Sequence, residues 1–230
     1  MSLFFHANKA QVDRYKDRNS ARIGITRKIV RKWGMTLTEI CMIRHGETNW
    51  NKEKRIQGNT DIPLNETGKS QAEVCCAAAK QFEPTVLITS PLARAKVTAE
   101  IINKDLRLPL HEMKAFVERS YGGAEGMTIE DRNRYFPDRE DIPNVETFED
   151  LKQRGLKGLE EVCERYPDER VLIVSHGALI NSLLSVISKG ELGTGITFLQ
   201  NTSITKFAHE NREWRVIDYN NTDHLAAVNE

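Results

Sequence analysis

The stretch that decides the fold reads ICMIRHGET and spans residues 40–48. Four apolar residues stop abruptly at Arg44, His45 and Gly46, which predicts a buried strand whose carboxyl end opens into a polar loop. In open α/β sheets, ligands bind just outside the carboxyl ends of the strands. A histidine beside an arginine at such an edge is a candidate nucleophile beside an anion clamp. The tripeptide alone is a weak motif, because an ordinary polar turn has the same composition.

A second apolar run ends in the same pair of residues. Residues 171–175 read VLIVS and are followed directly by His176 and Gly177. Continuous apolar runs are typical of strands that are covered on both faces. Two buried strands that end in His-Gly indicate a common sheet edge, at which both histidines lie close together.

The rest of the chain alternates between strand and helix patterns. Further strands are predicted at 39–43, 86–89 and 108–111, helices at 65–82, 90–104, 127–136, 147–166 and 178–187, and a hairpin from 203–209 and 214–219, with a long polar loop at 48–63 and coil after Asn221. The expected N-caps are Asn65, Ser90 and Thr147, with Pro91 at the first helical position. The alternation predicts the α/β class, as a three-layer α/β/α sandwich with a mainly parallel central sheet.

Composition argues against several kinds of partner. Lys and Arg together number 33, as do Asp and Glu, so no overall field favours nucleic acid or an anionic membrane. No apolar run approaches the roughly 18 residues that span a bilayer. The cysteines lack metal-ligand or redox spacing, which favours reduced thiols in a cytoplasmic protein. They are Cys41, Cys75, Cys76 and Cys163. A monomer and a homodimer are both compatible with the sequence.

Residues 1–34 differ in composition from the rest and form a basic N-terminal extension. They carry nine Lys and Arg against two Asp. Three interpretations are open: a basic arm that contacts nucleic acid or lipid head groups, a transit peptide, or a disordered or mis-started segment upstream of a start at Met35. The third is favoured, because residues 31–34 can be written in the purine-rich codons of a ribosome-binding site. The domain proper then spans residues 35–230.

Four groups converge if both His-Gly pairs share one sheet edge: Arg44, His45, Arg94 and His176. Arg94 falls in the first turn of a predicted helix, where free backbone N–H groups favour an anion. Two arginines provide forked donors for a tetrahedral oxyanion, and a histidine can form a covalent phospho-intermediate. A pair of histidines without carboxylate clusters is a poor metal site. The set is typical of phosphoryl transfer, with Glu118, after a strand and before glycines, as the expected acid.

Five sequence blocks contain these residues and their neighbours. In order they read RHGETNWN at 44–51, QGNTDIPL at 57–64, SPLARAKVTA at 90–99, ERSYGGAEG at 118–126 and VSHG at 174–177. They resemble the histidine phosphatase superfamily, which includes cofactor-dependent phosphoglycerate mutases and many broad-specificity phosphatases. The resemblance extends from Thr38 to about Asn221, and it implies a phosphoglycerate mutase-like fold and a histidine phosphatase domain.

The resemblance also implies a role for each matching residue. His45 is the expected phosphorylated nucleophile and Glu118 the proton donor, without a metal or a cofactor. The phosphoryl group is expected to bind to Arg44, Arg94 and His176. Further substrate contacts are expected from Asn51, Thr48, Gln57 and Gly177. Structural support or closure of the site is expected from Glu47, Glu125 and Asn201.

A metal-independent phosphatase that hydrolyses small phosphomonoesters is the leading hypothesis. Mutases with these motifs carry a longer insertion before the distal His-Gly, whereas only about 50 residues separate Gly126 from His176 here. A cofactor-dependent phosphoglycerate mutase is the alternative, and a non-catalytic binding protein on the same fold is a second. Residues 127–150 are an excursion that faces the substrate, and its departures from common family patterns concern specificity. The expected partner is a small phosphorylated metabolite.

Overall fold

A six-stranded sheet forms the centre of the molecule. The computed structural model describes residues 37–138 and 141–228, so the basic extension 1–34 lies outside the described residues. The strand order is β3-β2-β4-β1-β5-β6. The strands are β1 (Leu37–Arg44), β2 (Val86–Thr89), β3 (Leu110–Glu112), β4 (Arg170–Ser175), β5 (Ile204–Glu210) and β6 (Glu213–Asn221). The first four run parallel, and β5 and β6 form an antiparallel hairpin at one edge.

Helices connect the parallel strands, as the alternating pattern predicts. They are α3 (Asn49–Lys52), α4 (Glu66–Gln81), α5 (Ala93–Leu106), α6 (Ile129–Tyr135), α7 (Phe148–Arg165) and α8 (Gly177–Ile187). Shorter 3₁₀ turns are η1 (Lys114–Phe116), η2 (Gly122–Ala124) and η4 (Asp223–Val228). No helix among the described residues is long and apolar enough to cross a membrane.

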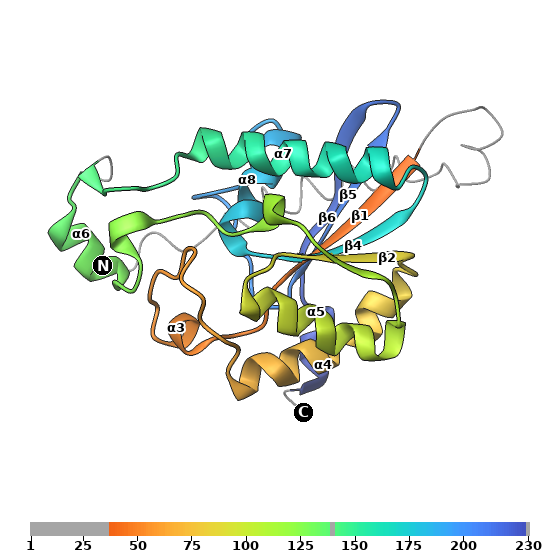
Figure 1. Cartoon of the computed structure of the whole chain (residues 1–230), viewed down its shortest axis with the longest axis horizontal. Coiled ribbons are helices and arrows are strands. Elements are labelled where there is room, and N and C mark those ends of the chain that lie inside the picture. The colour runs from red at the N-terminus through yellow and green to blue at the C-terminus, as the bar shows by residue number, and fades with distance from the viewer. Residues whose placement is uncertain (1–36, 139–140, 229–230) are drawn as a thin grey trace.

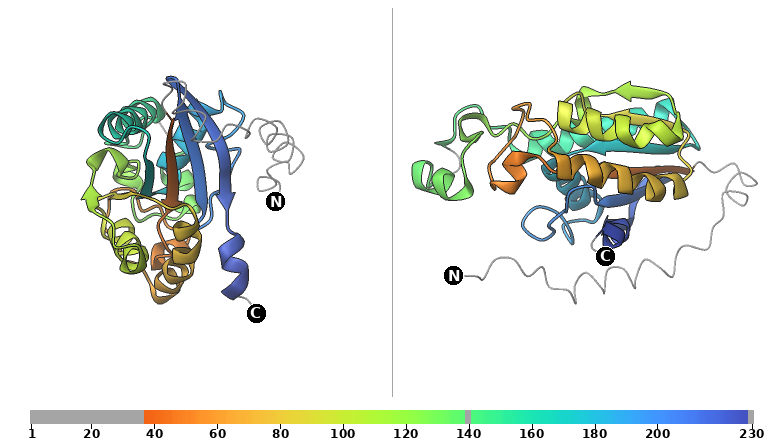
Figure 2. Two further views of the ribbon diagram at one scale, coloured as in Figure 1. Left: turned by 90° about the vertical axis from the view of Figure 1, so that its right-hand side faces the viewer. Right: turned by 90° about the horizontal axis from the view of Figure 1, so that it is seen from below.

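The sheet is covered on both faces, which explains its continuous apolar strands. In β1, Ile40 and Met42 pack with residues of α7 and α8 in one core cluster. Cys41 and Ile43 point the other way and pack with residues of α4 and α5 in a second cluster. Figures 1 and 2 show the same three layers, with the sheet between the two helix pairs. The predicted α/β/α sandwich with a mainly parallel sheet is therefore confirmed.

Local capping explains where most helices begin. The Asn65 side chain accepts a hydrogen bond from Gly68 N at the start of α4, and Thr147 accepts one from Asp150 N at the start of α7. The prediction for Ser90 and Pro91 is wrong, because α5 begins only at Ala93 and its N-cap is Leu92. A residue distant in sequence takes over the cap, since Ala93 N donates to Asp61 Oδ1 at 2.8 Å.

Three other elements differ from the sequence prediction. The third strand is displaced from the predicted residues 108–111 to Leu110–Glu112. Its position is set by pairing with Leu87 to Thr89 of β2, and the apolar pattern that centred the prediction on Leu108 and Leu110 does not set it. The polar loop at 48–63 contains the one-turn helix α3, which Thr48 and Asn51 close with a reciprocal capping box. The predicted C-terminal coil contains the 3₁₀ turn η4, which packs against α4.

The four cysteines are free thiols, and burial is the first cause of their raised pKa values. Burial raises the pKa of Cys163 to about 12, although this residue is only half-buried. Thiols with such pKa values stay protonated and unreactive at neutral pH. They therefore act as small apolar core residues, as the sequence predicts.

Candidate active site

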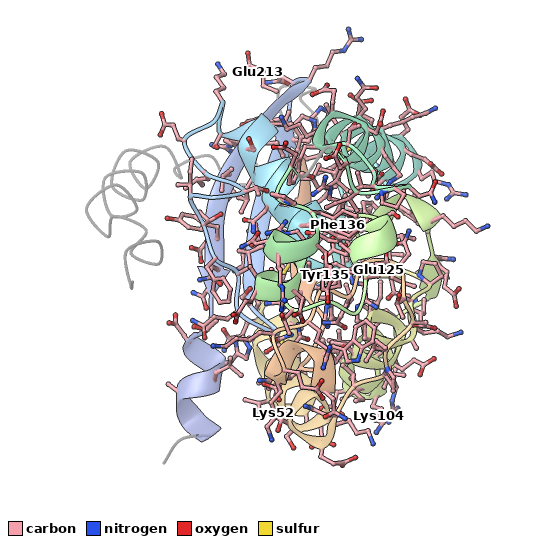
Figure 3. The ribbon with its side chains drawn as sticks, turned by 90° about the vertical axis from the view of Figure 1, so that its left-hand side faces the viewer. Lys52, Lys104, Glu125, Tyr135, Phe136 and Glu213 are labelled. Carbon is pink, nitrogen blue, oxygen red and sulfur yellow. The ribbon has the colours of Figure 1, made fainter. Side chains whose placement is uncertain are left out.

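Two neighbouring strands end at the same level, and this register brings the two His-Gly pairs together. Arg44 at the end of β1 pairs with Ser175 at the end of β4, so His45 and His176 follow side by side. Their ring centroids are 5.2 Å apart. Figure 3 looks at this end of the molecule, with Glu125, Tyr135 and Phe136 near its centre. The prediction of a shared sheet edge is correct.

His45 is buried and its tautomer follows from its one hydrogen bond. Nδ1 lies 2.7 Å from Gly46 O, and a carbonyl only accepts, so Nδ1 carries the proton. Nε2 is then left with its lone pair. Burial is the first cause that lowers the pKa of His45 well below 6.5, and the charges of Arg94 and Arg44 lower it further. The imidazole is neutral at neutral pH, which is the form that can act as a nucleophile.

His176 is oriented by Ser90, the residue first predicted to cap a helix. Ser90 Oγ accepts from Leu92 N at 3.3 Å and lies 2.8 Å from His176 Nε2. If the hydroxyl donates to Nε2, the His176 proton sits on Nδ1, which is buried and has no partner among the described residues. Burial, followed by Arg94 and His45, lowers the pKa of His176 well below 6.5. In that tautomer the neutral ring carries an N–H donor at Nδ1.

Both predicted arginines are held by backbone carbonyls through their terminal nitrogens. Arg94, fully buried, donates from Nη1 to Thr60 O at 2.9 Å and from Nη2 to Gly58 O at 2.7 Å. Arg44 donates from Nη1 to Leu199 O at 2.6 Å. The Nε atoms of both arginines are buried without a partner among the described residues. Burial is the main cause that lowers the pKa of both guanidinium groups.

Glu118 lies at the N-terminus of α8, next to His176 and Gly177. Its Oε1 accepts from Arg119 N at 2.9 Å and Leu179 N at 3.1 Å, and its Oε2 accepts from Ala178 N at 3.1 Å. Its charge is the largest influence after burial on the pKa of both Arg44 and Arg94, which it raises. Glu118 thus belongs to the same cluster, although it follows the turn η1 and not a strand as predicted.

The other predicted substrate residues form a connected layer beside His45. Thr48 Oγ1 donates to Gln57 Oε1 at 3.0 Å and also lies 3.1 Å from Asn51 Oδ1. Asn201 Nδ2 donates to His45 O at 3.0 Å and approaches Asn51 Oδ1 at 3.4 Å. The structure therefore brings Thr48, Asn51 and Gln57 together next to His45.

One glycine of the predicted motifs is required by close approach. A Cβ on Gly46 would lie 2.3 Å from Gly68 O, which is backbone of α4 and has no side-chain freedom to move. The contact docks the His45 loop onto α4. A Cβ on Gly177 would lie 3.4 Å from Arg44 Nε, which is an ordinary van der Waals contact, so this glycine lies against the arginine side chain without being required there.

Known proteins share both the sequence and the fold. The model of the histidine phosphatase superfamily (branch 1) matches residues 40–222. The chain belongs to this superfamily. An uncharacterized phosphatase, PhoE, of Bacillus subtilis (strain 168) is 47% identical over 190 residues, which cover 83% of this chain and 98% of that protein. A metal-independent phosphoserine phosphatase of Arabidopsis thaliana is 30% identical over 206 residues, covering 84% and 85%.

A solved structure supports the same assignment. Bacillus stearothermophilus YhfR superimposes with a TM-score of 0.76 at 28% identity, covering 82% of this chain and 99% of that chain. The family match and the phosphatase relatives show that this histidine phosphatase is a phosphoric monoester hydrolase. The described residues contain no group of three or more His, Cys, Asp or Glu arranged to hold a metal ion.

Sequence reasoning did not predict how Arg94 in this histidine phosphatase is positioned. Glu125 accepts from Asn59 N at 3.0 Å, Thr60 N at 2.9 Å and Tyr121 N at 3.0 Å. It therefore fixes the loop whose carbonyls hold Arg94. The Gln-Gly pair at 57–58 and the Glu-Gly pair at 125–126 mark both partners in the sequence, but only the fold shows that they meet.

A second positioning contact was also missed. Arg154 of α7 makes a bidentate ion pair with Glu146, at 2.9 Å from Nε and 3.0 Å from Nη2. Its Nη1 donates to Ala115 O and to Val117 O, and Val117 directly precedes Glu118. An arginine beside the apolar stripe of α7 is the sequence signal for this contact. The pair connects the excursion at residues 127–150 to the segment that carries the expected acid.

Proposed function

We propose that this histidine phosphatase hydrolyses small phosphomonoesters without a metal, through a phosphohistidine formed on His45. The observation that carries the proposal is a set of three buried side-chain nitrogens without a partner among the described residues: Arg44 Nε, Arg94 Nε and His176 Nδ1. Unpaired buried donors are costly, and a tetrahedral dianion would satisfy all three. Neutral His45 with a free Nε2 lies among them.

The reaction then proceeds in two displacements. His45 Nε2 attacks phosphorus and the bond to the leaving oxygen breaks, while Glu118 gives that oxygen a proton. Water next attacks phosphorus, Glu118 takes the water proton, and the phosphorus–nitrogen bond breaks to release phosphate and neutral His45. Arg44, Arg94 and His176 stabilise the charge on the phosphoryl oxygens in both steps.

The test uses two substrates that differ in leaving group. p-Nitrophenolate is a good leaving group and needs no proton. The serine alkoxide of phosphoserine is a poor leaving group and must receive a proton as it departs. We expect turnover of both in EDTA, loss of both in His45→Ala, and a much larger loss for phosphoserine than for p-nitrophenyl phosphate in Glu118→Gln. Phosphoserine is included because a relative is named for it. Glu112→Gln is the matched control, since Glu112 pairs with Lys96 on the surface.

Each part of the proposal can fail separately. Equal losses for both substrates in the single-turnover phosphorylation of Glu118→Gln, the one step that depends on the leaving group, would remove Glu118 as the proton donor. Full activity of His45→Ala, or no acid-labile phosphate on the wild-type protein, would remove the phosphohistidine. Turnover of 3-phosphoglycerate to its isomer only with 2,3-bisphosphoglycerate would establish the mutase alternative. No turnover of any phosphomonoester by folded protein would establish a binding role.

A further inference from the structure

The segment at residues 199–203 supports the proposed nucleophile from behind. Thr202 N donates to Arg44 O at 3.0 Å, and Arg44 N donates to Ser203 O at 3.2 Å. Asn201 Nδ2 donates to His45 O at 3.0 Å. The backbone of the two residues at the end of β1 is therefore fixed by this segment, and its geometry sets the position of the His45 ring.

Thr202 holds this segment in an unusual backbone conformation. Its φ is +55°, in the left-handed region that β-branched residues rarely adopt. The residue is fully buried, and its Oγ1 donates to Asn201 O at 2.8 Å. Strained conformations near functional sites persist only where surrounding contacts determine them. The contacts of Thr202 therefore decide whether Asn201 stays in place.

One of these contacts comes from the C-terminal turn η4, which lies beside α4 (Figure 1). His224 Nε2 lies 3.4 Å from Thr202 Oγ1. Its Nδ1 is buried without a partner among the described residues, and the ring also makes a hydrogen bond to the Thr202 backbone, which fits a proton on Nε2. Burial lowers the pKa of His224, which keeps the ring neutral. A chain of donors thus runs from His224 Nε2 through Thr202 Oγ1 to Asn201 O.

We propose that His224 is a positioning residue for the transfer step, acting through Thr202 and Asn201 on His45. The C-terminal turn is then part of the scaffold of the active site, although it contacts neither the substrate nor the side chains that bind the phosphoryl group. The proposal rests on the phosphohistidine mechanism of the preceding section. It predicts a larger effect on the rate at which His45 is phosphorylated than on binding of the phosphoryl group.

The experiment compares His224→Leu, which removes the donor, with His224→Gln, which keeps an N–H near the same place. Single-turnover phosphorylation with p-nitrophenyl phosphate and the inhibition constant of inorganic phosphate are measured. We expect His224→Leu to slow phosphorylation about three- to tenfold, the loss of one neutral hydrogen bond. The inhibition constant should change less than about twofold and His224→Gln should restore the rate. His209→Leu is the control, because His209 is also half-buried but pairs with Thr38 at the opposite end of β1.

Several results would overturn the proposal. A wild-type rate in His224→Leu would do so, as would a His224→Gln variant no faster than His224→Leu, or phosphate binding weakened in parallel. If His224→Leu does not fold, Thr202→Val breaks the same chain, and a wild-type rate in it refutes the inference equally. Absence of phosphohistidine in the wild type would instead refute the proposed mechanism, so the two failures are distinguishable.

Discussion

The carboxylate of Glu125 gives the sharpest test of how the site is built. It receives N–H bonds from Asn59, Thr60 and Tyr121 and a 2.5 Å bond from Thr60 Oγ1. Oε1 faces two backbone donors, and Oε2 faces one backbone donor and one hydroxyl. A Glu125→Gln variant keeps the shape but replaces one acceptor oxygen with a donor NH₂ group.

The magnitude follows from which oxygen is replaced. An NH₂ in place of Oε1 would face two N–H groups. An NH₂ in place of Oε2 would face only Thr60 N, because the Thr60 hydroxyl can rotate and accept. The second orientation is therefore adopted, and one backbone donor loses its acceptor at a cost of about 1–3 kcal/mol. The loop that carries Gly58 O and Thr60 O then holds Arg94 less firmly.

The assay combines urea unfolding with steady-state kinetics. Glu125→Gln should lose about 1–3 kcal/mol of unfolding free energy and about tenfold or more in kcat/KM. The same exchange at the surface, Glu112→Gln, should change stability by less than about 1 kcal/mol, because exposed ion pairs contribute little. If the two variants are equally stable and equally active, Glu125 does not position Arg94 and the reasoning is wrong.

Two further perturbations test the charges around the site. The folded pKa values of His45 and His176 lie below the ordinary 6.5, so the unfolded chain binds more protons below that pH. The free energy of unfolding should therefore fall as pH drops through 6.5, by up to about 1.4 kcal/mol per pH unit for each histidine. Urea unfolding of His176→Asn at several pH values should show a smaller dependence of this free energy on pH, because one of the two histidines no longer contributes. Arg154→Met should cost about 1–3 kcal/mol, because Glu146 loses its partner in a pair whose side chains are 28% and 17% exposed. Glu146→Gln should then recover part of that loss in the double variant, and additive thermal unfolding data would contradict the pairing.

Much of the site could be predicted because its members follow local patterns. Arg44, His45 and His176 stand directly after continuous apolar runs, and strand ends in a parallel sheet meet at one edge. Most of the failures involve contacts distant in sequence. Ser90 is a good N-cap by composition, yet His176 uses its hydroxyl and Asp61, 32 residues away, caps α5. No local rule can state which of two competing partners a serine will find.

The C-terminal turn shows the same limit in a segment that was predicted to have no regular structure. Residues after Asn221 carry no strong periodicity, and a polar tail is the natural interpretation. The structure forms a 3₁₀ turn there because η4 packs against α4 and His224 reaches Thr202. The sequence contains the histidine but not its partner, which lies in a buried left-handed turn that no propensity scale would assign to threonine.

The inner groups of the site are unpaired because an outer set of contacts holds them. Arg94 donates from both Nη atoms, and Arg44 from Nη1, to backbone carbonyls. His176 uses Nε2 on Ser90, and the two Nε atoms and His176 Nδ1 have no partner among the described residues. A group tied at one end cannot turn its remaining donor toward the protein, so the cost of the unpaired donors is retained until an anion binds. Changes to inner groups should therefore remove phosphoryl binding. Changes to the outer contacts through Glu125 should lower rate and stability together while the protein still folds.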